Sequence, residues 1–142
     1  MKNKLIMLAL MGTMFSFSSC EKDMDTYDFS NSMPAYVEIK SKANIEVEEE
    51  KTASITFQSR EFFQQDKTLK YEVTGAFTKS GTVTLARNTN SITLNLPVPA
   101  NVVPAGQTSA TATLTLVEAD GLSVGRKGSD KEKVVLQITP KL

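Results

Sequence analysis

The chain has 142 residues with 16 basic and 16 acidic side chains, no histidine and a single cysteine. A balanced charge argues against a nucleic-acid partner, because binding to phosphates requires clustered positive charge. The missing histidine removes the commonest general base and metal ligand, and a lone cysteine allows no disulfide within the chain.

The first 19 residues have the composition of a secretory signal peptide. A basic start (Met1–Lys4) precedes a mostly apolar run of 13 residues (Leu5–Phe17) and the small residues Ser18 and Ser19. This order of basic, apolar and small residues predicts export and cleavage. The run is too short to cross a bilayer, which takes about 20 residues. We therefore expect residues 1–19 to be a cleaved signal peptide, with a buried helix as the alternative.

The residues at the cleavage site, Phe17-Ser18-Ser19-Cys20, resemble the bacterial lipobox. They match it at the two small residues and the cysteine and depart from it at Phe17, where leucine is commoner. The resemblance implies diacylglycerol on the Cys20 sulfur and an acyl group such as palmitate on the new amino terminus. Several acyl chains anchor a protein firmly, because each buried methylene contributes about 0.8 kcal/mol. An ordinary signal peptide with a chance cysteine is the alternative.

A charged stretch, Glu21-Lys22-Asp23-Met24-Asp25, follows the cysteine. It resembles the export signal of Bacteroidetes surface lipoproteins, which implies a place on the outer membrane, exposed at the cell surface. A solvated tether has the same composition and leaves the periplasmic face as the alternative. Residues 20–33 show no hydrophobic period, and we expect the lipidated cysteine and a flexible linker there.

From Pro34 to the end, apolar and polar residues alternate with a period of two, which is typical of half-buried strands. The chain holds eight such segments, at 37–39, 45–47, 53–57, 69–73, 83–85, 92–96, 110–116 and 134–138. We expect residues 34–142 to form an all-β, immunoglobulin-like sandwich of about seven or eight antiparallel strands. A partly closed barrel is the alternative.

Two long connections interrupt this pattern. Residues 97–107 contain three prolines and a glycine, which excludes a central strand and indicates a crossing between the sheets. Residues 119–131 contain three glycines, and we expect a long hairpin loop between the last two strands.

The segments Gly81-Thr82-Val83-Thr84-Leu85 and Ser91-Ile92-Thr93-Leu94-Asn95-Leu96-Pro97-Val98 resemble the middle of Calx-beta domains. This implies a small immunoglobulin-like sandwich, a module that occurs in Bacteroidetes lipoproteins beside glycan-uptake systems. Some members bind calcium through an acidic cluster after the second segment. Here Pro97-Val98-Pro99 stands at that place, so calcium binding does not carry over.

Few residues are candidates for a site. Phe62 and Phe63 can stack on a sugar or anchor a protein partner, although capping the end of the sandwich is the simpler interpretation. Arg126 and Lys127 lie among glycines whose spacing does not fit a phosphate-binding loop, so a polar hairpin tip is expected. The four glutamates between positions 46 and 50 suit either a solvated turn or a calcium site, and the solvated turn is favoured.

These observations predict a non-catalytic module with no cofactor and no metal, engaged in binding or assembly at the cell surface and linked to glycan uptake. Phe62, Phe63, Arg126 and Lys127 are the expected contacts with a glycan or an envelope protein. The alternative is a structural spacer, or a periplasmic-facing lipoprotein that docks to an envelope complex. That alternative predicts an uncovered sheet edge or an apolar face.

Overall fold

The computed structural model describes residues 33–142, which form one compact unit with its own core. The predicted signal peptide and nearly all of the predicted tether, Cys20 included, lie outside the described residues. Among residues 33–142, no helix is long and apolar enough to span a bilayer.

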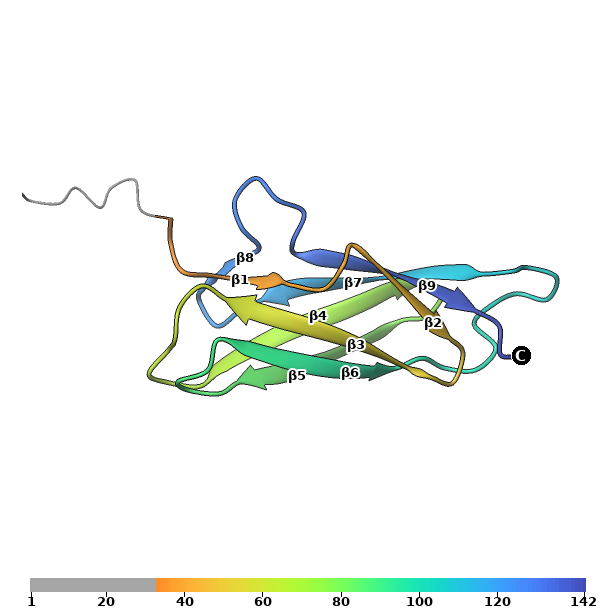
Figure 1. Ribbon diagram of the computed structural model, residues 1–142, viewed down its shortest axis with the longest axis horizontal. Coiled ribbons are helices and arrows are strands. Elements are labelled where there is room, and N and C mark those ends of the chain that lie inside the picture. Colours follow the sequence, from red (N-terminus) through yellow and green to blue (C-terminus); the bar gives the residue numbers. More distant parts are fainter. Residues whose placement is uncertain (1–32) are drawn as a thin grey trace, which may run out of the picture. The chain divides into compact units, whose positions relative to one another are not determined.

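The described chain consists of nine strands joined by turns (Figure 1). They are β1 (Tyr36–Ile39), β2 (Asn44–Glu48), β3 (Thr52–Ser59), β4 (Lys67–Gly75), β5 (Lys79–Leu85), β6 (Ser91–Pro97), β7 (Ala110–Glu118), β8 (Ser123–Val124) and β9 (Lys133–Thr139). All eight segments that alternate in the sequence are strands, so the period of two identified them correctly.

The strands form two sheets packed face to face. Sheet A has the order β6-β3-β1-β8 and sheet B the order β2-β9-β7-β4-β5. The predicted immunoglobulin-like sandwich is therefore confirmed, and the alternative of a single barrel is wrong. The connection from β6 to β7 passes from sheet A to sheet B, as its prolines predicted.

The first two strands follow each other along the sandwich but belong to different sheets. β1 ends in sheet A, the chain crosses over at residues 40–43, and β2 continues at the edge of sheet B. Two bonds fix the crossing on the side of sheet A: the Lys40 N–H donates to the Thr56 carbonyl (2.8 Å), and the Thr56 N–H donates to Ser41 Oγ (2.9 Å). On the side of sheet B, the Val135 N–H donates to the Ala43 carbonyl (2.9 Å).

Two pairings are parallel, which the prediction of antiparallel strands did not include. β2 runs parallel to β9, and β1 runs parallel to β8. Both follow from the crossing, because the first and last parts of the chain run in the same direction along the sandwich. The other pairings are antiparallel.

The 119–131 segment is not one long loop, contrary to the prediction. It contains β8, whose two residues pair with β1, and the Gly125 N–H donates to the Val37 carbonyl (2.7 Å). A two-residue strand is too short to show an alternation of apolar and polar side chains, so β8 could not be predicted from the period of two.

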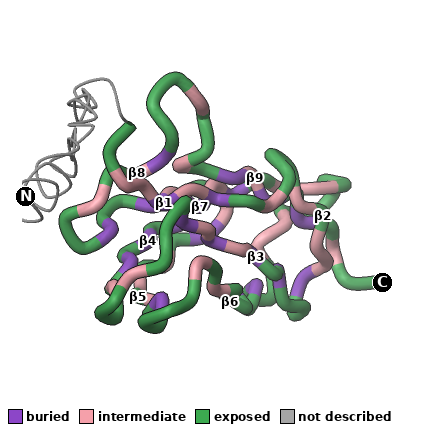
Figure 2. The backbone as a smooth tube through the Cα atoms, turned by 60° about the vertical axis from the view of Figure 1, so that its left-hand side comes forward, coloured by how far each residue is buried: buried purple, intermediate pink, exposed green. Residues whose placement is uncertain are grey.

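The core fills the space between the sheets. Buried and exposed residues alternate along the strands, so each sheet has one dry and one wet face (Figure 2). The largest fully buried side chain, Phe57, lies on β3. It packs with aliphatic residues of both sheets, among them Ile55 and Leu96 of sheet A and Leu114 and Leu136 of sheet B. Burial of apolar surface contributes about 25 cal/mol per Å², so this layer makes the main contribution to the stability of the fold.

Gly75, at the end of β4, has a conformation that a side chain does not tolerate. Its φ is +110°, and a Cβ built there would lie 2.7 Å from the Thr111 carbonyl oxygen. The contact is with the backbone of the neighbouring strand, where Gly75 pairs with Ala112. A side chain would therefore separate β4 from β7.

We predict that Gly75→Ala lowers the free energy of unfolding by about 3–4 kcal/mol, the sum of a positive-φ penalty and a backbone clash. Gly106→Ala is the matched control, because its φ is +85° but no atom lies within 4 Å of the added Cβ. Its expected loss is about 1–2 kcal/mol, from the conformation alone. Urea unfolding of both variants measures the difference, and equal losses would contradict the predicted clash.

Candidate functional site

Phe62 and Phe63 follow β3 and have different environments. Phe62 is 63% exposed, whereas Phe63 is partly buried against the core. The Lys67 ammonium lies 5.8 Å from the Phe63 ring centroid, and the Phe63 carbonyl accepts the Asn88 N–H at 2.7 Å. Phe63 is thus the ring that caps the end of the sandwich, and Phe62 is the one free to contact a ligand.

Arg126 and Lys127 lie in the turn between β8 and β9. The Arg126 carbonyl accepts bonds from the Ser129 N–H (3.0 Å) and the Ser129 hydroxyl (2.8 Å), which closes the turn. Lys127 lines a hollow of about 310 Å³ together with the first described residues, Met33 and Pro34. Tyr36 and residues 123–125 complete its mostly apolar wall.

A second hollow of about 110 Å³ lies on the other side of Tyr36. Its wall consists of Tyr36, Glu38, Gln58, Ser59 and Arg60. β1 and β3 pair with Glu38 opposite Gln58, so these long polar side chains stand on the outer face of sheet A. Tyr36 therefore separates an apolar hollow that contains Lys127 from a polar hollow that contains Arg60.

Four side chains of this second hollow have no polar partner in the described part of the chain. Within residues 33–142, no hydrogen bond or ion pair joins the side chains of Tyr36, Glu38, Gln58 or Arg60 to another residue. Their donors and acceptors remain available to a ligand. The Ser59 hydroxyl, by contrast, donates to the Glu61 carbonyl (2.6 Å) and holds the chain as it leaves β3.

Of the four predicted contact residues, Lys127 lines the apolar hollow, and Phe62 belongs to neither of the two hollows beside Tyr36. The sequence analysis did not identify Tyr36 or Arg60 as candidates. The alternation of Tyr36 and Glu38 with buried Val37 and Ile39 was a usable signal, since it places an aromatic and a carboxylate side by side on a wet face.

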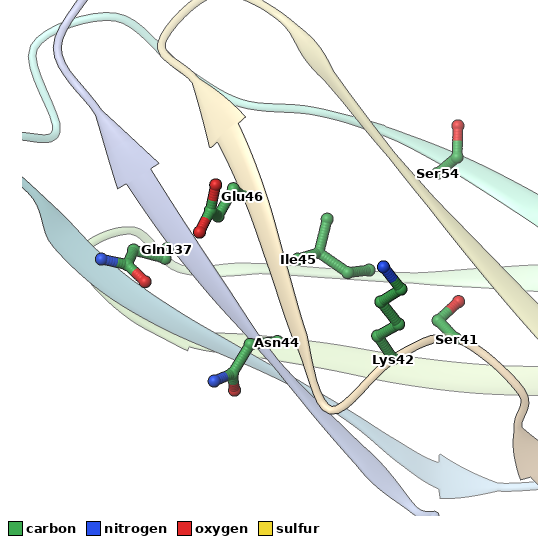
Figure 3. Close-up of a pocket in the computed structure, with 7 residues that line it drawn as sticks. All are labelled: Ser41, Lys42, Asn44, Ile45, Glu46, Ser54 and Gln137. Carbon is green, nitrogen blue, oxygen red and sulfur yellow. The ribbon is translucent and has the colours of Figure 1, made fainter.

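A hollow of about 630 Å³ lies where the chain crosses between the sheets (Figure 3). Its lining consists of Ser41, Lys42, Asn44, Ile45, Glu46, Ser54 and Gln137. Figure 3 shows Ser41, Lys42 and Ile45 between β2 and β3, while Asn44, Glu46 and Gln137 lie on the other side of β2.

The glutamates between positions 46 and 50 have structural contacts. Glu49 is 8% exposed and accepts the Val103 N–H at 2.8 Å, which ties the β6–β7 connection to the turn after β2. Glu50 pairs with Lys141, and Glu48 accepts the Leu142 N–H at 3.0 Å. Three glutamates thus hold this connection and the last residues of the chain, and no group of three potential metal ligands occurs within residues 33–142.

Because Glu49 is buried, its protonation state affects the stability of the fold. The Val103 N–H holds the pKa of Glu49 below its ordinary value of 4.5, and burial acts in the opposite direction. A carboxylate with a lowered pKa stabilises the fold at pH values above 4.5, and this contribution is lost as the pH falls through the folded-state pKa.

We predict that Glu49→Gln is less stable than the wild type at pH 7 and that this gap narrows as the pH falls from 4.5 through the lowered folded-state pKa, where the native carboxylate takes up its proton. Urea midpoints at pH 7 and pH 3 measure the gap. Glu46→Gln, on the exposed outer face of sheet B, corrects for the loss of one charge. A gap of the same size at both pH values would show that ionised Glu49 does not stabilise the fold.

Comparison with known proteins supports the fold. No protein-family model matches the chain, and no curated protein matches it. Among solved structures, the apo-form CBD1 domain of Calx superposes with a TM-score of 0.56 at 9% identity, over 78% of this chain and 100% of that one. The domain is thus a Calx-beta-like β-sandwich. A structure titled for toxic shock syndrome toxin-1 in T cell activation covers 75% of this chain and 99% of its own at 12% identity, with a TM-score of 0.33 that carries no argument.

Proposed function

We propose that this protein is a bacterial lipoprotein, anchored through Cys20, whose Calx-beta-like sandwich is a non-catalytic binding module at the cell surface. The observation that carries the binding role is the uncommitted polar hollow beside Tyr36. A tyrosine ring, a carboxylate, an amide and a guanidinium supply an apolar face together with acceptors and donors. A sugar unit has the complementary chemistry, since its ring faces are apolar and its hydroxyls both donate and accept.

The anchor in this proposal rests on the sequence around Cys20 and on the resemblance of residues 17–25 to lipoprotein signals of the Bacteroidetes. The described chain begins at Met33, which lines the hollow next to Tyr36. From Cys20 to Met33 there are 13 peptide units, which reach at most about 45 Å when fully extended. The tether is therefore long enough for the module to turn and present Tyr36 to a glycan on its way to an uptake system.

A structural or docking role is the second candidate, on the periplasmic face or at an envelope complex. A specific observation favours it: β2 and the first half of β3 border the hollow at the crossing with edges that pair with no strand among residues 33–142. An uncovered edge is the feature that this role requires.

The anchor has a direct test in the native host. We expect the wild-type protein to sediment with the outer membrane and Cys20→Ala to remain soluble, because the variant has no sulfur to lipidate. We also expect protease added to intact cells to digest the wild-type domain. Protection until the cells are lysed would contradict exposure at the surface.

The binding role has its own test on a glycan array, using residues 20–142 with Cys20→Ser so that no lipid is attached. We expect Tyr36→Ala to lower binding at least tenfold, by loss of the ring contact, and Phe62→Ala to lower it if that ring extends the site. Val117→Ala, 45% exposed on β7, is the control for the loss of a surface apolar side chain. If the unsubstituted chain binds no glycan, the sugar-binding role is wrong.

A further inference from the structure

β3 loses its neighbour half-way along its length. β1 pairs with β3 only where Val37–Ile39 lie opposite Phe57–Ser59, after which the chain leaves for sheet B. From Thr56 back to Thr52, β3 keeps β6 on one side and has no strand from residues 33–142 on the other. Figure 1 shows the chain leaving β3 between β1 and β2, and β2 leading back to β3 through the turn that joins them.

The hydrogen bonds around this gap show which main-chain groups of β3 face it. Thr56 directs its N–H and its carbonyl to the crossing, where Ser41 and Lys40 bind them. Main-chain groups of alternate residues point to the same side of a strand, so those of Ser54 and Thr52 also face the gap. On the outer face, the Ser54 hydroxyl donates to Asn95 Oδ1, and these two residues lie opposite each other at a position where β3 and β6 exchange no main-chain bonds.

On the opposite side of the gap, the hydrogen bonds of β2 show in the same way which of its main-chain groups face the gap. The Ala43 carbonyl accepts the Val135 N–H, and the Glu49 N–H donates to the Thr139 carbonyl, so the odd-numbered residues of this stretch bond to β9. The N–H groups of Asn44, Glu46 and Glu48 therefore point away from β9. The carbonyls of Asn44 and Glu46 do so too, while that of Glu48 accepts the Lys51 N–H in the following turn (3.1 Å).

These unpaired groups border the hollow of about 630 Å³, which is lined by Ile45 and Lys42 as well as by Ser54 of β3 (Figure 3). Unpaired main-chain donors and acceptors along a strand edge are complementary to another extended chain. The other edges of the described sheets are less suitable for the addition of a strand. β8 has two residues, β6 ends at Pro97, which has no N–H, and β5 and β6 lie against each other.

We propose that this gap is a docking slot for an extended peptide segment of a partner protein, which adds to the edge of β2 as a further strand of sheet B. The main-chain groups of Asn44 and Glu46 bind the backbone of the added strand. Ile45 contacts an apolar side chain of the segment, and the Lys42 ammonium favours a carboxylate near its end. The slot is separate from the Tyr36 hollows, so the proposal does not depend on glycan binding.

The proposal is tested by selecting a phage-displayed library of random linear peptides on residues 20–142 with Cys20→Ser. We expect enriched peptides with β-branched or aromatic residues and an acidic residue, whose binding Glu46→Pro weakens by roughly tenfold, the equivalent of about 1.4 kcal/mol. Proline removes the N–H that faces the slot but no N–H that bonds to β9. Glu46→Thr is the matched control and keeps binding within about threefold, since it changes the side chain and keeps the main-chain donor.

A second measurement does not depend on the proline variant remaining folded. In a ¹⁵N-labelled unsubstituted chain, the enriched peptide is expected to shift the amide signals of Asn44 and Glu46, and those of Tyr36 and Arg60 are expected to stay in place. No enriched peptide, or enriched peptides that shift other amides, would overturn the proposal. A dimer of the chain that Glu46→Pro dissociates would also overturn it, because the slot would then serve a second copy.

Discussion

The first two strands, β1 and β2, lie in different sheets, and the arrangement of both ends of the sandwich depends on the crossing between them. β1 completes sheet A beside β3, and after the crossing β2 forms the edge of sheet B beside β9. The crossing is held by the bonds of Lys40 and Ser41 to Thr56 on one sheet and of Ala43 to Val135 on the other. It places β1 in sheet A and β2 in sheet B with a single stretch of chain and produces the parallel pairings with β8 and β9.

The crossing also determines where polar groups are committed and where they remain free. After β2, the turn at Glu48–Glu50 binds the β6–β7 connection and the last residues of the chain, so its charges stabilise the fold. At the other end of β1, the side chains around Tyr36 have no such partners among the described residues. In the middle, the separation of β2 from β3 leaves strand edges with free main-chain groups. The proposed functions follow from these last two places, because only uncommitted groups can bind a ligand or a partner.

The sequence predicted the class of fold and eight of the nine strands, because a half-buried strand imposes a period of two on its own residues. It did not predict β8 or the parallel pairings, which depend on contacts between distant segments. The same limit applies to the sites. Phe62 and Phe63 could be chosen from their residue type, but their different exposure depends on the packing of Phe63 against the core. The hollow beside Tyr36 requires β1 and β3 to lie in register, and the role of Glu49 requires Val103, which is far away in the sequence.

Amide hydrogen exchange of the free protein tests most directly whether the edge of β2 is open. Exchange is slow for amides that bond within a sheet and fast for amides that face water. We expect slow exchange for Ile45 and Val47, which bond to β9, and fast exchange for Asn44 and Glu46, which alternate with them. Equal protection of all four amides in the monomer would contradict the account, because it would mean that the edge of β2 is already covered.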